Sequence, residues 1–335
     1  MNIKRNLRLT ILGILCLLLV VGCSESTSKG SQGKNNAADD AAQWPTKDIH
    51  INIHSGSGNL DTAIRQLAPM LEEELGVNVI AENLPGGAQS ISQTATQTAS
   101  ADGYTFQTMT SSTSFGMAQE QIPFGPEDWS LVYSLQQEPA SIAVPADSPL
   151  KTMDDFVEAM KNNPDEFIVG GYGSAGFMTY VYYKLQKIAD FESKWIPIDT
   201  TDKVAASLLG GHIDVAIMTP STALSSLESG EIRLLAVSSE ERTENYPEVP
   251  TFKEEGYDIT ETLWRGLAAK KGTPEEIIDK MHQAIKKVTE TEKWLAFQKK
   301  RNQENDTTSP DKLDERLKSE VNGRIEFSKD MGLLE

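Results

Sequence analysis

The sequence predicts an α/β protein made of two units in which strands alternate with helices, followed by helices at the C-terminal end. One observation is the segment 49–61, where isoleucines alternate with polar residues and a glycine-containing turn leads into an amphipathic helix. Another is the recurrence of the same order at residues 167–179. A third is the length of 335 residues, which is enough for two domains with their own cores.

The first unit follows a β-α-β-α-β order. Its strands are expected at residues 49–53, 77–82 and 104–109. Alternation of Ile49, Ile51 and Ile53 with polar residues predicts that one face of the first strand is buried. Residues 55–59, here named the first loop, separate this strand from a helix expected over residues 61–75. The alternation predicts a parallel sheet whose ligands bind at the carboxyl ends of the strands, where the first loop and the polar run 110–114 lie.

The second unit shows the same alternation of strands and helices, and after it the chain is expected to return to the first unit. Its strands are expected at residues 141–145, 167–171, 213–217 and 232–238. A return strand is expected at residues 263–269, and helices begin near Pro274 and Pro310. If this helical end packs back on the first unit, the chain crosses over near residues 140 and 264. The predicted domains are therefore 44–139 with 264–335, and 140–263.

Residues 1–22 have the character of an export signal rather than of a folded segment. Basic residues precede an apolar run at residues 10–21, which is short for a membrane span. The run ends in Val20, Val21, Gly22 and Cys23, which resembles the lipobox of bacterial lipoproteins. That resemblance implies cleavage before Cys23 and lipid attachment to it, with residues 23–43 as a flexible tether. The alternative is an uncleaved N-terminal anchor.

Charge and cysteine content exclude several classes of function. The formal net charge of −18 argues against nucleic acid and against charge-driven binding to anionic lipid. A carboxylate ligand remains possible, because backbone N–H groups act locally and distant surface acids are screened beyond about 10 Å. The second cysteine, Cys16, lies in the signal, so the mature chain has no disulfide pair and no thiol nucleophile.

A nucleotide-dependent exported enzyme is an alternative that the glycines raise. Gly171, Gly173 and Gly176 fit G-x-G-x-x-G after a strand, and Asp199 follows at a suitable distance. Export argues against this interpretation, because an enzyme outside the membrane would lack a recycled pool of nicotinamide cofactor. The four histidines show no spacing typical of a metal site or a catalytic site. We therefore expect no enzyme activity, no cofactor and no metal, while the glycine loop can still hold an anion at a helix N-terminus.

Eight short segments occur in one order between Trp44 and Leu333. They are IHINIHSGSGNLD at 49–61, ENLPGG at 82–87, DGYTF at 102–106, TSST at 110–113, GSAG at 173–176, LLGGHID at 208–214, VPTFKEEGY at 249–257 and WRGLAAKKGTP at 264–274. Together they resemble the substrate-binding proteins of tripartite tricarboxylate transporters, also called Bug-type periplasmic receptors. The resemblance implies a type 2 periplasmic-binding-protein fold, in which two α/β domains joined by two hinge strands close on a small carboxylate.

The resemblance also implies how the ligand is held. In that family, backbone amides and small hydroxyls of the first loop and of the GSAG loop (residues 173–176) hold one ligand carboxylate. The positions that carry over are Ser57, Gly58, Asn59, Ser111, Ser112, Gly173, Ser174, Ala175 and Gly176, with Thr219 toward the distal end of the ligand. A side-chain clamp by Arg265 is the competing hypothesis.

This sequence departs from the family at several positions that tune the distal end of the ligand. The departures are Leu60, Phe177, Met178, Thr179, Tyr180 and Met218. They imply a ligand, such as a di- or tricarboxylate, that is less polar than citrate. The resulting expectation is a monomeric, lipid-anchored receptor on the outer side of the cell membrane that delivers a carboxylate to the membrane subunits of a transporter. A receptor that signals to a membrane sensor kinase is the alternative.

Overall fold

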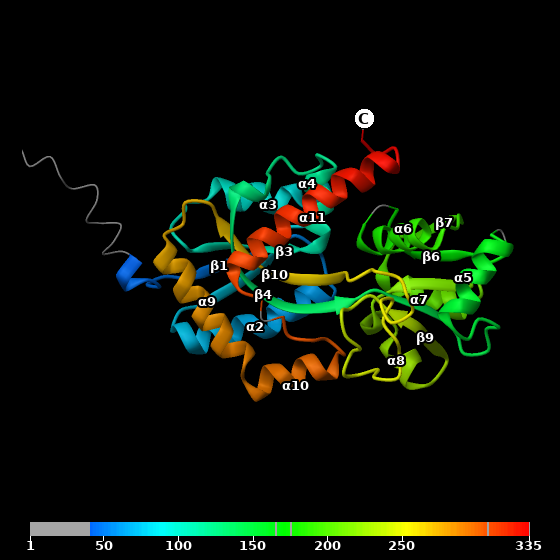
Figure 1. Cartoon of the computed structure of the whole chain (residues 1–335). Helices are drawn as coiled ribbons and strands as arrows, with labels where there is room; N and C mark the ends of the chain where they lie inside the picture. The colour runs from blue at the N-terminus through cyan, green and yellow to red at the C-terminus, as the bar shows by residue number, and fades with distance from the viewer. Residues whose placement is uncertain (1–40, 165, 175, 307, 335) are drawn as a thin grey trace, which may run out of the picture. The chain divides into compact units, whose positions relative to one another are not determined.

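Two five-stranded sheets organise the chain (Figure 1). The computed structural model describes residues 41–164, 166–174, 176–306 and 308–334, which belong to one compact unit. The predicted export signal, Cys23 and residues 23–40 of the predicted tether lie outside these ranges. Searched over the described residues, no helix combines the length and the apolar character that a membrane span needs.

The first sheet has the strand order β2-β1-β3-β10-β4. Its strands are β1 (Ile49–Ile53), β2 (Val79–Asn83), β3 (Thr105–Thr110), β4 (Trp129–Pro139) and β10 (Thr262–Lys270). Strands β2 and β3 both run parallel to β1, whereas β10 runs antiparallel to β3 and to β4. The chain leaves this sheet after β4 and returns to it through β10.

The second sheet has the order β7-β6-β8-β5-β9. Its strands are β5 (Ser141–Pro145), β6 (Val169–Tyr172), β7 (Trp195–Ile198), β8 (Val215–Met218) and β9 (Ile232–Val237). Strands β6, β7 and β8 are parallel, and β5 is antiparallel to both of its neighbours. The predicted parallel arrangement is confirmed for β1, β2 and β3 and for β6, β7 and β8, whereas β5 and β10 run antiparallel to their neighbours. The two antiparallel strands, β5 and β10, are the ones by which the chain enters one sheet from the other.

Helices follow most strands, and in the described part of the chain three of them follow β10, the last strand. The longer helices are α2 (Asn59–Leu75), α3 (Ser90–Thr98), α4 (Ser111–Ala118), α5 (Met153–Asn162), α6 (Phe177–Ala189), α7 (Thr201–Leu209), α9 (Glu275–Thr289), α10 (Glu292–Lys300) and α11 (Pro310–Asp330). Short helical turns are η1 (Gly87–Gln89), η2 (Pro126–Asp128), η3 (Pro220–Ala223) and α8 (Leu224–Glu228). A capping box begins α5, because the side chains of Thr152 and Asp155 each accept a hydrogen bond from the other's backbone N–H.

Strand β1, which lies between β2 and β3, is buried on both faces, so the prediction of one buried face is wrong. Ile49, Ile51 and Ile53 are fully buried, but the alternating residues Asn52 and His54 are buried as well. The Asn52 side-chain amide donates to Thr96 Oγ1 of α3 at 2.8 Å. A polar residue thus lies inside because a helix covers that face and offers a hydrogen-bond partner.

Helix α11 contacts elements that belong to both sheets. Leu313 and Leu317 near its start share a hydrophobic cluster with Trp129 and Leu131 of β4. Phe327 near its end lies edge-on to Tyr180 of α6, with ring centroids 5.2 Å apart. Figure 1 shows this helix, in red, running along one side of the described unit. The C-terminal helix is therefore part of the packing of both halves.

Candidate functional site

The first loop and the start of α4 lie at the same edge of the first sheet. They follow β1 and β3, which are neighbouring parallel strands, so their carboxyl ends point the same way. The backbone N–H of His54, at the end of β1, donates to Thr108 Oγ1 of β3 at 3.1 Å. The structure thus brings Ser57, Gly58 and Asn59 to the sheet edge that also carries Ser111 and Ser112.

His54 supports this edge as a neutral side chain. Its Nδ1 lies 3.0 Å from the carbonyl oxygen of Thr108, which can only accept, so the ring proton is on Nδ1. Burial lowers the pKa of His54 to about 4, and the hydrogen bond to Thr108 opposes that effect only in part. His54 therefore adds no positive charge beside the first loop at neutral pH.

The GSAG loop and Thr219 share an edge of the second sheet. They follow β6 and β8, which are also neighbouring parallel strands. Gly173 has φ of 78°, a left-handed conformation that favours glycine. Its carbonyl oxygen accepts a hydrogen bond from the indole nitrogen of Trp195 at 2.7 Å. Ala175 lies outside the described residues.

Packing explains one of the three glycines, Gly171, Gly173 and Gly176, that fit the dinucleotide-binding pattern. A Cβ on Gly171 would come within 2.5 Å of the Trp195 ring and of the Ile217 carbonyl oxygen. Gly171 therefore allows β6 to pack under Trp195. A Cβ on Gly173 or Gly176 would meet no described atom within 4 Å, so crowding does not explain glycine at these two positions.

Helices α2 and α6, which begin at these edges, have open N-termini. The N-cap residues of α2 and α6 are Gly58 and Gly176, and no described side chain caps either helix. Their first N–H groups are thus available to an anion, and the helix dipole favours negative charge there. Helix α4 differs, because the side chains of Thr110 and Thr113 cap its start.

The two edges are linked directly. Asn59 Nδ2 donates to Ser221 Oγ at 3.2 Å, which joins the start of α2 to the turn that follows Thr219. In addition, Phe115 of α4 lies 5.8 Å, ring to ring, from Tyr180 in the first turns of α6. The first loop, the start of α4 and the strand ends of the second sheet are therefore near one another.

The predicted ligand-binding residues differ in their exposure and in whether their hydroxyl groups already have hydrogen-bond partners. Ser57, Gly58 and Ser174 are exposed, and Ser112 is half-buried. The hydroxyl of Ser111 is engaged inside the fold, because it donates to the Thr262 carbonyl and accepts from the Trp264 N–H. The hydroxyl of Thr219 lies 3.2 Å from Ser221 Oγ and 3.0 Å from Thr222 Oγ1. Ser111 and Thr219 can thus shape the site, but their protons have partners within the chain.

The positions at which the sequence departs from the family are all buried. Leu60, Phe177, Met178, Thr179, Tyr180 and Met218 are each at most 8% exposed. Phe177, Met178 and Tyr180 belong to a hydrophobic cluster with Phe115 and Phe327. Packing between α4, α6 and α11 accounts for these large side chains.

Arg265 is already paired and buried. Its guanidinium forms an ion pair with Glu138 of β4, and the side chains are 8% and 1% exposed respectively. Gln303 Nε2 also donates to Glu138 Oε1 at 2.9 Å. A clamp by Arg265 on a ligand would first have to break this pair. Sequence reasoning missed Glu138, which follows Gln136 and Gln137 and belongs to no motif.

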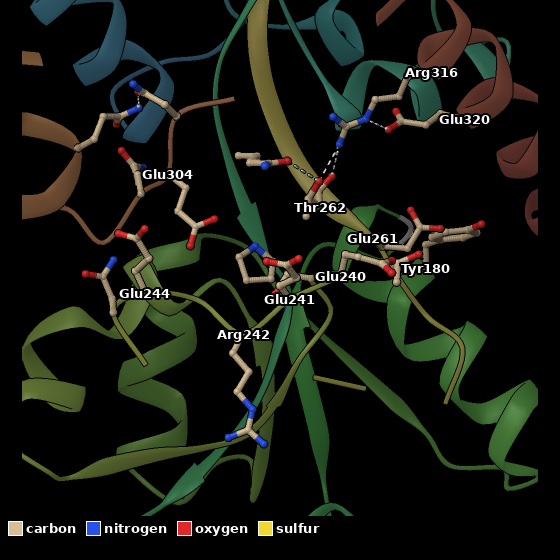
Figure 2. Close-up of a pocket in the computed structure, with 18 of the residues that line it drawn as sticks. Tyr180, Glu240, Glu241, Arg242, Glu244, Glu261, Thr262, Glu304, Arg316 and Glu320 are labelled. Atoms are coloured by element: carbon tan, nitrogen blue, oxygen red, sulfur yellow. Dashed lines mark hydrogen bonds and ion pairs between the residues drawn. The ribbon is translucent and has the colours of Figure 1, made fainter. Parts of the chain in front are cut away.

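A separate large cavity lies between the segment after β9 and the C-terminal helices (Figure 2). Its volume is about 1250 Å³. The carboxylates that line it are Glu240, Glu241, Glu244, Glu261, Glu304 and Glu320, and the cations are Arg242, Lys299, Arg316 and Arg324. None of the predicted ligand-binding residues that the structure describes is among its lining residues.

The charges of this cavity do not suit an anion. Arg316 is paired with Glu320 and Asp306, and Arg324 is paired with Glu261. Burial raises the pKa of Glu304, and Glu244 and Glu138 raise it further. Because acids are in excess and the central arginines are neutralised, a carboxylate would be repelled here. The two sheet edges are the better candidate site.

Known proteins resemble this chain along most of its length. A family model described as tripartite tricarboxylate transporter family receptor matches residues 63–331. A UPF0065 protein in the gbd 5' region of Cupriavidus necator is 33% identical over 252 residues, which cover 74% of this chain and 76% of that protein.

Solved structures resemble the described fold over most of the chain. A ligand-free TctC solute-binding protein from Polaromonas has a TM-score of 0.77 at 24% identity and covers 86% of this chain and 99% of its own. The R. palustris protein Rpa4515, solved with adipate, has a TM-score of 0.73 at 22% identity and covers 86% of this chain and 98% of its own. These likenesses confirm the expected two-domain periplasmic-binding-protein fold.

Proposed function

This chain belongs to the receptor family of tripartite tricarboxylate transporters, and we propose that it captures a small carboxylate and delivers it to the membrane subunits of such a transporter. The proposed domains are residues 44–139 with 264–335, and residues 140–263, with the ligand between them. In this proposal the protein is a monomer that releases its ligand unchanged.

The observation that carries the proposal is a pair of uncapped helix N-termini, one after a strand of each sheet. Helix α2 starts beside the first loop and helix α6 starts after the GSAG loop, and neither is capped by a described side chain. Charge-assisted hydrogen bonds from such N–H groups contribute roughly 1.5–3 kcal/mol each. The solved structure with adipate supports a dicarboxylate as the first ligand to test.

Titration calorimetry on freshly purified protein tests this proposal. We expect adipate to bind, and citrate is titrated beside it as the more polar acid. A nicotinamide dinucleotide serves as the control for the exported-enzyme alternative and should give no heat. Native mass spectrometry of the same sample should reveal any retained carboxylate. Absence of carboxylate binding and of a retained acid would contradict the proposal.

We also propose that the mature chain starts at Cys23 and is lipid-anchored on the outer side of the cell membrane. The lipobox resemblance at residues 20–23 motivates this proposal. Labelled fatty acid should enter the wild-type protein but not Cys23→Ala. Equal labelling of the two would remove the lipoprotein assignment.

A further inference from the structure

A chain of hydrogen bonds runs from the end of α10 to the paired strands β4 and β10. Arg301 donates to Asn59 Oδ1, and Asn59 Nδ2 donates to Ser221 Oγ at 3.2 Å. Ser221 in turn donates to Oε2 of Glu138. The other carboxylate oxygen of Glu138, Oε1, accepts a hydrogen bond from Arg265. Five residues that are far apart in sequence thus form one relay, named here the Glu138 relay.

The charged groups of Arg301 and Glu138 determine which atom donates in each hydrogen bond between them. Arginine can only donate, so the amide oxygen of Asn59 must face Arg301 and its NH₂ must face Ser221. A carboxylate can only accept, so the single proton of Ser221 goes to Glu138. Ser221 is then left with acceptor capacity alone, which suits both the Asn59 amide and the Thr219 hydroxyl. No member has to change its orientation to satisfy its neighbours.

The relay joins the predicted ligand contacts to the strands through which the chain passes between sheets. Asn59 is the first residue of α2, and Ser221 lies in η3 directly after Thr219. Glu138 is the second-last residue of β4, and Arg265 lies in β10. With Glu138 1% exposed and Arg265 8% exposed, this end of the relay is shielded from water.

We propose that Glu138 is a positioning residue for ligand binding, which acts through Ser221 on the Asn59 side chain and so sets the start of α2 and the first loop. This inference rests on the proposed function, because Asn59 is one of the predicted carboxylate contacts. Glu138 and Ser221 need not touch the ligand. Their role is to hold the N–H groups of the first turn of α2 where the anion is received.

Hydrogen exchange of the ligand-free full chain tests the positioning step without any ligand. In Ser221→Ala, the amides of residues 62–66, which bond within the first turns of α2, should exchange at least about twofold faster, because one hydrogen bond that holds Asn59 is lost. Amides of β9 should be unchanged and serve as the internal reference. Ser225→Ala is the matched control, since Ser225 is an exposed serine on the next helical turn. Ser221→Thr keeps the hydroxyl and should recover most of the protection.

A double variant separates a relay from two independent stabilising effects. Glu138→Gln should also speed exchange at residues 62–66, and Glu138→Gln with Ser221→Ala should resemble the stronger single variant. Titration with adipate should show a two- to tenfold weaker affinity in Ser221→Ala, about the effect of one hydrogen bond. Unchanged exchange in Ser221→Ala, or fully additive effects in the double variant, would overturn the inference. If adipate and citrate fail to bind the wild type, the proposed function fails, whereas the exchange result still decides the positioning role.

Discussion

At the residue scale, His54 shows how a polar residue can serve the site without contacting a ligand. It ends β1, and its ring proton is committed to Thr108 of the adjacent strand. Burial keeps the imidazole neutral, since desolvation lowers its pKa to about 4. A charged imidazole here would lose the solvation that it has in the unfolded chain.

This geometry predicts a pH dependence of folding stability with a definite sign. The unfolded chain binds a proton at His54 near pH 6.5, whereas the folded chain binds it only near pH 4. Stability should therefore fall as the pH drops from 6.5 to 4, and this histidine should contribute about 3 kcal/mol of that fall. Urea unfolding at pH 7 and pH 4.5 should show a smaller loss in His54→Gln than in wild type. Equal losses would show that carboxylates alone cause the acid sensitivity.

Some residues of the site could be predicted from sequence and others could not. The glycines and small hydroxyls of the first loop and the GSAG loop stand beside recognisable strands and helices, so the pattern locates them. Glu138 and Arg265 gave no such signal, because their pairing depends on the register of β4 against β10. Arg301 reaches Asn59 across 242 positions of sequence, which no local pattern encodes.

At the element scale, the structure contains a strand and a helix that the hydrophobic pattern did not reveal. Strand β4 is buried along most of its length, and it carries Ser134 and Glu138 inside. Ser134 donates to Asp306 at 2.6 Å, so partners from distant segments allow polar residues in a buried strand. Helix α4 is rich in serine and threonine, and it owes its start to the cap at Thr110. Burial and capping outweigh weak local propensity in both elements.

The GSAG loop gives a prediction that separates backbone from side-chain recognition. Gly173 has φ of 78°, which a β-branched residue strongly disfavours. Gly173→Val should therefore weaken adipate binding by much more than tenfold. Ser174→Ala removes only an exposed hydroxyl and should cost at most about tenfold, or roughly 1.4 kcal/mol.

Two further variants control this comparison in titration calorimetry. Gly211 has φ of 68° and lies in the exposed turn after α7, so Gly211→Val imposes similar backbone strain away from the candidate site. It should bind adipate like the wild type. Arg265→Ala tests the competing clamp. If Gly173→Val binds adipate with near-normal affinity and only a folded Arg265→Ala protein loses binding, recognition by the backbone is contradicted.

At the scale of the whole molecule, the ligand is expected to bridge two halves, each of which has its own five-stranded sheet. The predicted contacts at the first sheet edge come from α2 and α4, and those at the second edge come from the GSAG loop and Thr219. An anion held by both edges would gain most of its hydrogen bonds only when the edges approach each other. Binding should therefore favour a closed arrangement, since a ligand shifts a conformational equilibrium by its differential affinity for the two states.

Spin labels can measure this closure directly, because the chain has only two cysteines, Cys16 and Cys23. In a background that replaces both with alanine, labels at Glu73→Cys on α2 and Glu158→Cys on α5 report across the proposed domains, and both sites are exposed. Adipate should change the distance distribution of this pair. A pair at Glu73→Cys and Lys293→Cys lies within one proposed domain and should not change. The change in the first pair should vanish in Gly173→Val at the same adipate concentration, because the second edge can no longer grip the anion. If adipate binds by calorimetry and both pairs keep their distances, the ligand does not close the protein, and the two edges do not hold it together.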